Sequence, residues 1–128
     1  MKAYWDSSAL VEAIIDPEIK QRLENENGFT RPHTLAETFS ALTGNQQLRI
    51  DGGSAARILE NISTRLEFVE LSAREILNAL KTARQKGVRG GRVHDYLHAV
   101  AAEKSAKKIL TLDRNDFDGL TKLSIEQI

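Results

Sequence analysis

Short apolar runs alternate along the chain with stripes of apolar residues at helical spacing. Residues 3–5, which read Ala-Tyr-Trp, form a run that suits a strand buried on both faces, and the run ends at Asp6. Ser7 and Ser8 follow, and their hydroxyls can accept hydrogen bonds from the first turn of a helix that begins near Ala9. This segment therefore predicts a strand, a carboxylate at its carboxyl end and then a helix.

The alternation of strand and helix continues through the rest of the chain. Further strands are predicted at residues 28–31, 66–71, 108–112 and, weakly, 123–125. Helices are predicted around stripes at residues 10–15, 19–23, 34–43, 51–62, 72–86 and 93–101. Residues 45–50 fit either a loop or the tail of the preceding helix. Because helices separate the strands, the pattern predicts an α/β fold: a parallel sheet reached by right-handed crossovers and covered by helices on both faces.

For two of these helices, the apolar stripe predicts which side chains face the core. In the helix at residues 34–43, the residues expected to face the core are Leu35, Phe39 and Leu42. The helix at residues 72–86 opens with the capping-box pattern Ser72-x-x-Glu75. There the residues expected to face the core are Ile76, Leu77 and Leu80.

Composition adds little to this picture but excludes some classes of protein. With 128 residues, 41% of them hydrophobic and 28% charged, residues 1–128 are expected to form a single globular domain. Cysteine is absent, so neither a disulfide framework nor a thiolate metal site is possible. We expect a cytoplasmic protein, because no basic leader and no membrane-spanning apolar run is found. The 18 basic and 18 acidic residues cancel, so any nucleic-acid surface must come from local segregation of charge.

Four acidic residues fall where strands end or where the following helices begin. Two follow strands and two lie in first helical turns: Asp6 and Asp113, then Glu37 and Asp95. Carboxyl ends of parallel strands and amino ends of the following helices share one edge of a sheet, so the four are expected to converge. Converging carboxylates repel one another and imply a cation, and oxygen ligands favour Mg²⁺ or Mn²⁺. Two such ions can activate water for attack on a phosphodiester, which is nuclease chemistry.

Each acid also has a purely structural interpretation. Asp6 can be a cap or turn residue, and Asp113 can belong to a turn. Thr34-x-x-Glu37 is a capping-box pattern, in which Glu37 would only bond back to the helix start. Asp95 can simply favour the dipole of its helix. Spacing alone leaves these alternatives open.

Charged residues outside the four acids form two further groups. Asp116 and Asp118 follow the fourth strand closely, and either one of them joins the acids or both are solvated loop residues. Residues 76–94 contain no acid but five basic residues: Lys81, Arg84, Lys86, Arg89 and Arg92. This stretch is either an exposed helix face or a surface that grips RNA phosphates, for which Lys86, Arg89 and Arg92 are the candidates.

The chain resembles the PIN domain, and more narrowly the VapC-type toxin ribonucleases. The motifs that carry the resemblance are Asp-Ser-Ser-Ala-Leu-Val at residues 6–11, Thr-Leu-Ala-Glu at 34–37, His-Asp-Tyr-Leu-His-Ala at 94–99 and Leu-Thr-Leu-Asp-Arg-Asn-Asp-Phe at 110–117. The resemblance implies a three-layer α/β/α fold with strand order 3-2-1-4-5 and Mg²⁺- or Mn²⁺-dependent cleavage of RNA. It also implies the toxin of a type II toxin-antitoxin pair, with a cognate antitoxin and a homodimer or a hetero-oligomer with that antitoxin.

The resemblance also assigns roles to individual residues. The residues that match the family's acidic quartet are Asp6, Glu37, Asp95 and Asp113. Ser8 and Thr111 match hydroxyls that hold the carboxylates or metal-bound water, and Asp116 matches a position that varies in the family. The plain sequence after Leu120 leaves the sheet with four or five strands.

Other classes of function remain as alternatives. His94 and His98 lie one helical turn apart, as in zinc peptidases, but Asp95 is a poor substitute for the glutamate base and no third ligand is evident. A response-regulator receiver would need paired acids after the first strand, which Asp6-Ser7 does not supply. A PIN-like module without catalysis, which only binds RNA or protein, would normally lack one of the four acids, and none is missing.

Overall fold

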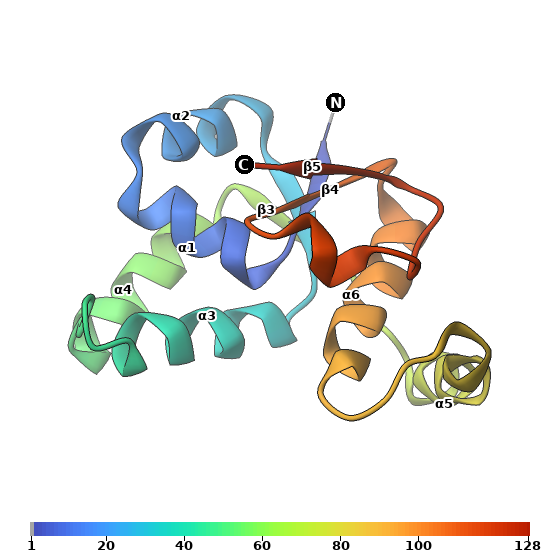
Figure 1. Ribbon diagram of the computed structural model, residues 1–128. Helices are drawn as coiled ribbons and strands as arrows, with labels where there is room; N and C mark the ends of the chain where they lie inside the picture. Colours follow the sequence, from blue (N-terminus) through green and yellow to red (C-terminus); the bar gives the residue numbers. More distant parts are fainter. Residues whose placement is uncertain (1) are drawn as a thin grey trace.

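The computed structural model describes residues 2–128, which form a five-stranded parallel sheet in the order β3-β2-β1-β4-β5 (Figure 1). The strands are β1 (Ala3–Trp5), β2 (Gly28–Thr30), β3 (Leu66–Phe68), β4 (Lys108–Thr111) and β5 (Ser124–Gln127). Neighbouring strands pair in parallel throughout, as the alternation of strand and helix predicts. The fifth strand is formed and pairs with β4 along its whole length, which settles the number of strands.

Helices cover both faces of this sheet (Figure 1). Between residues 2 and 128 they are α1 (Ser7–Ile15), α2 (Pro17–Glu26), α3 (His33–Gly44), α4 (Gly52–Ser63), α5 (Ala73–Ala83) and α6 (Arg92–Ser105). Short 3₁₀ turns follow α5 and β4, at Arg84–Lys86 (η1) and Arg114–Phe117 (η2). Residues 45–50 are a loop rather than the tail of α3. Within this described part of the chain, no helix has both the length and the apolar character that crossing a membrane requires.

The two faces of the sheet bury separate clusters of apolar side chains. Tyr4 and Ile109 belong to the cluster under α5 and α6, whereas Trp5 and Leu110 belong to the cluster under α1 and α2. All four side chains are at most 1% exposed. Successive residues of a strand point to opposite faces of the sheet. The two adjacent residues of β1, and likewise those of β4, therefore pack against helices on opposite faces. The three-layer α/β/α arrangement follows directly.

The start of α1 differs from the sequence prediction. Ser7 is already inside the helix, and the cap is Asp6, whose Oδ1 accepts a hydrogen bond of 2.8 Å from the backbone N–H of Ala9. Ser8 does not cap the helix either: its hydroxyl donates to Asp6 Oδ1 over 2.7 Å. The predicted serine caps are therefore wrong. A carboxylate in the extended backbone between strand and helix satisfies the first-turn donors itself.

Three of the apolar residues expected in the core are exposed. Phe39 is 38% exposed on α3, and Leu77 and Leu80 are 48% and 44% exposed on α5. On α5 the buried residues are instead Ala79 and Ala83. Small side chains allow α5 to approach α6 closely, and this rotates the leucines towards solvent. The prediction was correct for Leu42, which is fully buried, and for Leu35 and Ile76, which are partly buried against the core. Periodicity therefore identified both helices but only part of the face that each one buries.

Candidate active site

Asp6 is buried at the carboxyl ends of the central strand β1 and its neighbour β4. Three groups hold its side chain: the N–H of Ala9 and the hydroxyl of Ser8 donate to Oδ1, and the hydroxyl of Thr111 donates to Oδ2 over 2.7 Å. Ser8 also accepts a hydrogen bond of 2.9 Å from the backbone N–H of Leu112. Ser8 and Thr111 therefore fix the orientation of a carboxylate that is only 4% exposed.

Asp95 lies in the first turn of α6 and is half-buried. From residues 2–128 its carboxylate accepts no hydrogen bond. Burial, followed by the negative charges of Asp116, Asp6 and Glu37, raises the pKa of Asp95 to about 6 against the opposing effect of His98. Burial also raises the pKa of Asp6, although its hydrogen bonds oppose the shift. These carboxylates, which come from distant parts of the sequence, therefore lie close enough to repel one another.

Glu37 is not part of a capping box. The helix α3 begins at His33, with Pro32 as its N-cap and no side-chain cap, so Thr34 lies inside the helix. The Thr34 hydroxyl lies 2.8 Å from the hydroxyl of Thr30 on β2 and is fully buried. The structure thus contradicts the capping interpretation: the hydroxyl that the box would need is used by the neighbouring strand.

Glu37 instead reaches across the site to α6. Its Oε1 lies 2.6 Å from Nε2 of His98. Burial alone would raise the pKa of Glu37, but the hydrogen bond from His98 and the nearby imidazoles of His33 and His94 outweigh it and lower the pKa overall. Glu37 is therefore an ionised carboxylate at neutral pH.

The two histidines of α6 have different surroundings. The exposed ring of His94 stacks on His33, with centroids 5.9 Å apart and planes inclined by 20°. The ring of His98 is 2% exposed and lies between Tyr4 and Glu37. Because the rings contact different neighbours, the geometry gives no support to a zinc-binding histidine pair. The sequence motif did not reveal the contact between His98 and Glu37.

Asp113 and Asp116 lie in the turn that follows β4. Asp113 is exposed, and its Oδ1 accepts a hydrogen bond of 2.9 Å from the backbone N–H of Asn115. Burial raises the pKa of Asp116, and the charges of Asp113 and Asp6 add to the shift. Asp118 is exposed and contributes only its backbone carbonyl, which accepts a hydrogen bond from Arg92. Of the two later acids, Asp116 faces the group and Asp118 is a loop residue.

The donor atoms suit a hard divalent cation. Across residues 2–128 no three acidic or histidine side chains are gathered tightly enough to enclose an ion by themselves. However, Asp95, Asp116 and the Oε2 atom of Glu37 accept no hydrogen bond from this part of the chain, and all of them offer carboxylate oxygen. Mg²⁺ and Mn²⁺ are held in proteins by a few carboxylates together with water and substrate oxygens. The residues present therefore fit such an ion.

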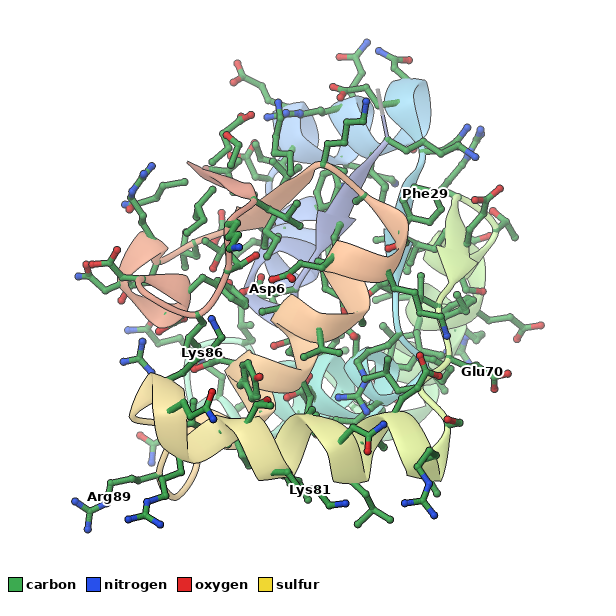
Figure 2. The ribbon with its side chains drawn as sticks, turned by 90° about the vertical axis from the view of Figure 1, so that its right-hand side faces the viewer. Asp6, Phe29, Glu70, Lys81, Lys86 and Arg89 are labelled. Atoms are coloured by element: carbon green, nitrogen blue, oxygen red, sulfur yellow. The ribbon has the colours of Figure 1, made fainter. Side chains whose placement is uncertain are left out.

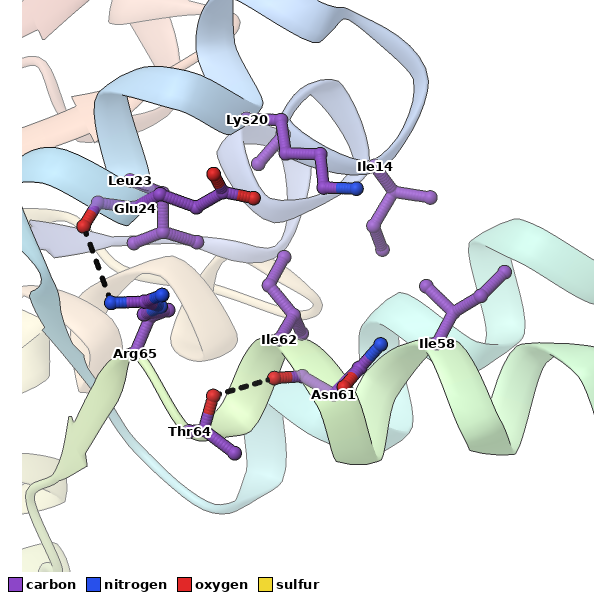
Figure 3. A pocket seen from close by; sticks show the side chains of 10 residues that line it. Ile14, Lys20, Leu23, Glu24, Ile58, Asn61, Ile62, Thr64 and Arg65 are labelled. Carbon is purple, nitrogen blue, oxygen red and sulfur yellow. Dashed lines mark hydrogen bonds between the residues drawn. The ribbon is translucent and has the colours of Figure 1, made fainter.

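The acids do not line the hollow that Figure 3 shows. A hollow of about 290 Å³ lies between α1, α2 and α4 (Figure 3). Its walls combine the apolar side chains Ile14, Ile58 and Ile62 with the charged Lys20 and Glu24. The acidic group lies instead at the carboxyl edge of the sheet.

The basic residues lie on α5 and on the loop before α6. Figure 2 shows Lys81 and Arg89 pointing away from the molecule, and Lys81, Lys86 and Arg89 are all exposed. Gly87 and Gly90 have φ of 68° and 56°, left-handed conformations that allow the loop to turn into α6. Arg92 is partly engaged, because its guanidinium donates a 2.7 Å hydrogen bond to the carbonyl of Asp118.

Comparisons with known proteins agree with this fold. The family model described as PIN domain matches residues 3–123. The chain is similar in fold to a crystal structure of PAE2754 from Pyrobaculum aerophilum, with a TM-score of 0.70 and 20% sequence identity. That similarity covers 98% of this chain and 88% of the other. A search of curated proteins finds no significant match.

Proposed function

Because this chain belongs to the PIN domain family, whose members are generally nucleases, we propose that it hydrolyses RNA phosphodiester bonds with Mg²⁺ or Mn²⁺. The observation that carries the proposal is the half-buried Asp95, which lacks a hydrogen-bond donor in the described chain and faces the charges of Asp116, Asp6 and Glu37. A structure that only had to be stable would not gather unbalanced carboxylates in this way. A divalent cation would remove the repulsion.

In this proposal the acids are the metal ligands, and two hydroxyl side chains support one of them. The residues proposed to hold the cations are Asp6, Glu37, Asp95 and Asp113, with Asp116 as a further candidate. Ser8 and Thr111 keep the Asp6 carboxylate in one orientation through the hydrogen bonds described above. The bound ions would supply an activated water and stabilise the leaving oxygen of the phosphodiester.

The direct test is cleavage of RNA by the purified protein, freed of any antitoxin. Cleavage should begin when Mg²⁺ or Mn²⁺ is added to metal-free protein, and it should stop when a chelator removes the ion. Gel analysis of an end-labelled RNA measures both. Cleavage that persists in chelator would show a different mechanism, and inert protein in either ion would favour a module that only binds.

Lys86, Arg89 and Arg92 are proposed to contact RNA phosphates. Because Arg92 is engaged with Asp118, Lys86 and Arg89 are the cleaner pair to replace with alanine. In chelator, where RNA stays intact, this double variant should bind single-stranded RNA more weakly. The slope of log K against log salt should decrease by about 0.7 for each lost phosphate contact. Fluorescence anisotropy over a series of salt concentrations measures this slope.

The control for this experiment is a second pair of exposed lysines. Lys107 and Lys122 precede β4 and β5, so they lie at the amino edge of the sheet, opposite the acids. Their replacement by alanine removes the same number of charges but should leave the salt slope unchanged. Equal slopes for both double variants would exclude Lys86 and Arg89 from the RNA-binding surface.

We further propose that the protein is a cytoplasmic toxin of a type II toxin-antitoxin pair. A cognate antitoxin would lay an acidic or arginine-bearing segment over the acids and the basic residues Lys86 and Arg89, and would thereby compete with RNA. A homodimer or a toxin-antitoxin hetero-oligomer is the assembly expected for such a pair. The sequence motifs quoted above support this finer assignment.

A further inference from the structure

Three side chains from three different elements form a continuous line of hydrogen bonds that ends at the acid Glu37. The hydroxyl of Tyr4 on β1 lies 2.6 Å from Nδ1 of His98 on α6. Nε2 of the same imidazole lies 2.6 Å from Oε1 of Glu37 on α3. Tyr4 is fully buried and His98 is 2% exposed, so water does not compete for either contact.

The protons in this line can be assigned from the chemistry of its two ends. An ionised carboxylate only accepts hydrogen bonds, so Nε2 of His98 must donate to Glu37. Burial raises the pKa of Tyr4 well above its ordinary value, so its phenol keeps its proton. That hydroxyl satisfies Nδ1, which leaves neither ring nitrogen of His98 without a partner.

These contacts leave the imidazole with a single orientation. The Tyr4 and His98 rings meet edge to face, with centroids 5.7 Å apart and planes inclined by 63°. Rotation of the imidazole would break both hydrogen bonds in a place where water cannot replace them. The ring therefore presents its Nε2–H to Glu37 from a fixed position.

Glu37 gains a defined orientation from this contact. A glutamate side chain has three rotatable bonds and is otherwise mobile at the edge of a site. Here Oε1 is tethered to His98, whereas Oε2 accepts no hydrogen bond within residues 2–128. One oxygen is thus held and the other is available.

We propose that His98 is a positioning residue, which holds Glu37 with one carboxylate oxygen free for a divalent cation, and that Tyr4 holds His98 in turn. This inference rests on the proposed function, because it concerns Glu37 as a ligand. The opposing interpretation is a core histidine that merely satisfies its own hydrogen bonds. The two differ in whether the affinity for the cation depends on His98.

The test is the dissociation constant for Mn²⁺, measured by calorimetry on metal-free protein without RNA. His98→Leu keeps an apolar side chain in the buried space but removes both hydrogen bonds. Its affinity for Mn²⁺ should fall by roughly 10- to 100-fold, the range typical of residues that orient metal ligands. Melting temperatures confirm that each variant is folded at the temperature of the titration.

Two amide variants separate the two hydrogen bonds of His98. The amide nitrogen of glutamine reaches about as far as Nε2, so His98→Gln should keep the contact with Glu37 and recover most of the affinity. The shorter asparagine matches Nδ1 only, so His98→Asn should bind Mn²⁺ as weakly as the leucine variant. If the leucine variant fails to fold, the Mn²⁺ dissociation constants of the glutamine and asparagine variants are compared instead. Equal constants for these two variants would overturn the proposal.

A double-mutant cycle tests whether His98 acts through Glu37. In a Glu37→Ala background nothing remains to be positioned, so adding His98→Leu should not weaken Mn²⁺ binding further. A long-range ¹⁵N spectrum of the metal-free protein should also show the proton on Nε2 of His98. If the wild type binds Mn²⁺ and the His98→Leu variant binds it equally tightly, this inference alone is overturned. Wild-type protein that does not bind Mn²⁺ at all would overturn the proposed function and this inference together.

Discussion

Replacing Asp95 with asparagine is expected to abolish metal-dependent RNA cleavage while the protein remains folded. Asparagine keeps the shape of the side chain but removes the negative charge that attracts a divalent cation in a partly desolvated site. The loss should exceed the roughly 10- to 100-fold typical of residues that only orient metal ligands. Initial rates of RNA cleavage at saturating Mn²⁺ measure it, and undiminished turnover would exclude Asp95 from the site.

The same variant should be more stable than the wild type in metal-free buffer. The pKa of Asp95 is raised from 3.8 to about 6 in the folded protein, so the folded state binds this proton more tightly than the unfolded state. The charged form therefore destabilises the fold: the penalty is complete above about pH 6 and disappears as the pH falls towards 3.8. The gain in melting temperature of Asp95→Asn should be larger at about pH 7.5 than at about pH 5.

Asp118→Asn is the matched control for this prediction. Asp118 is exposed, lies in the same region of the structure and contributes only its backbone carbonyl to a hydrogen bond. Its variant should cleave RNA at the wild-type rate and show no gain in melting temperature at either pH. A gain as large as that of Asp95→Asn would mean that general charge reduction, and not relief of repulsion in the site, explains the effect.

Replacing Glu37 with glutamine is the second change for which a large effect is expected. The amide carbonyl can still accept the hydrogen bond from Nε2 of His98, so the tether and the metal-free stability should be preserved. The charge is lost, however, and RNA cleavage should fall steeply. The increase in melting temperature on adding Mn²⁺ should also shrink, because a bound ligand stabilises the fold according to its affinity.

Glu60→Gln provides the comparison for this experiment. Glu60 is exposed on α4, and its replacement removes the same charge away from the edge of the sheet that holds the acids. It should change neither the rate of cleavage nor the response to Mn²⁺. A Glu37→Gln protein that matched this control in both measurements would leave the site with Asp6, Asp95 and Asp113.

Local sequence was sufficient for the elements and for part of the site. The apolar run that ends at Asp6, and the strand that leads to Asp113, placed both acids at the carboxyl edge of the sheet. The alternation of strands with helices predicted the parallel sheet, and family motifs predicted its strand order. These features depend on residues that are near one another in the chain, where the periods of helix and strand are directly visible.

Only the tertiary structure decided which partner each polar group has. The capping pattern of Thr34 and Glu37 looked complete in the sequence, but the Thr34 hydroxyl contacts Thr30 and Glu37 contacts His98, 61 residues away. In the same way, the close approach of α5 to α6 determined that Ala79, and not Leu77, is buried. A hydrogen-bonding group takes the partner that the fold brings nearest, and periodicity along the chain contains no information about that distance.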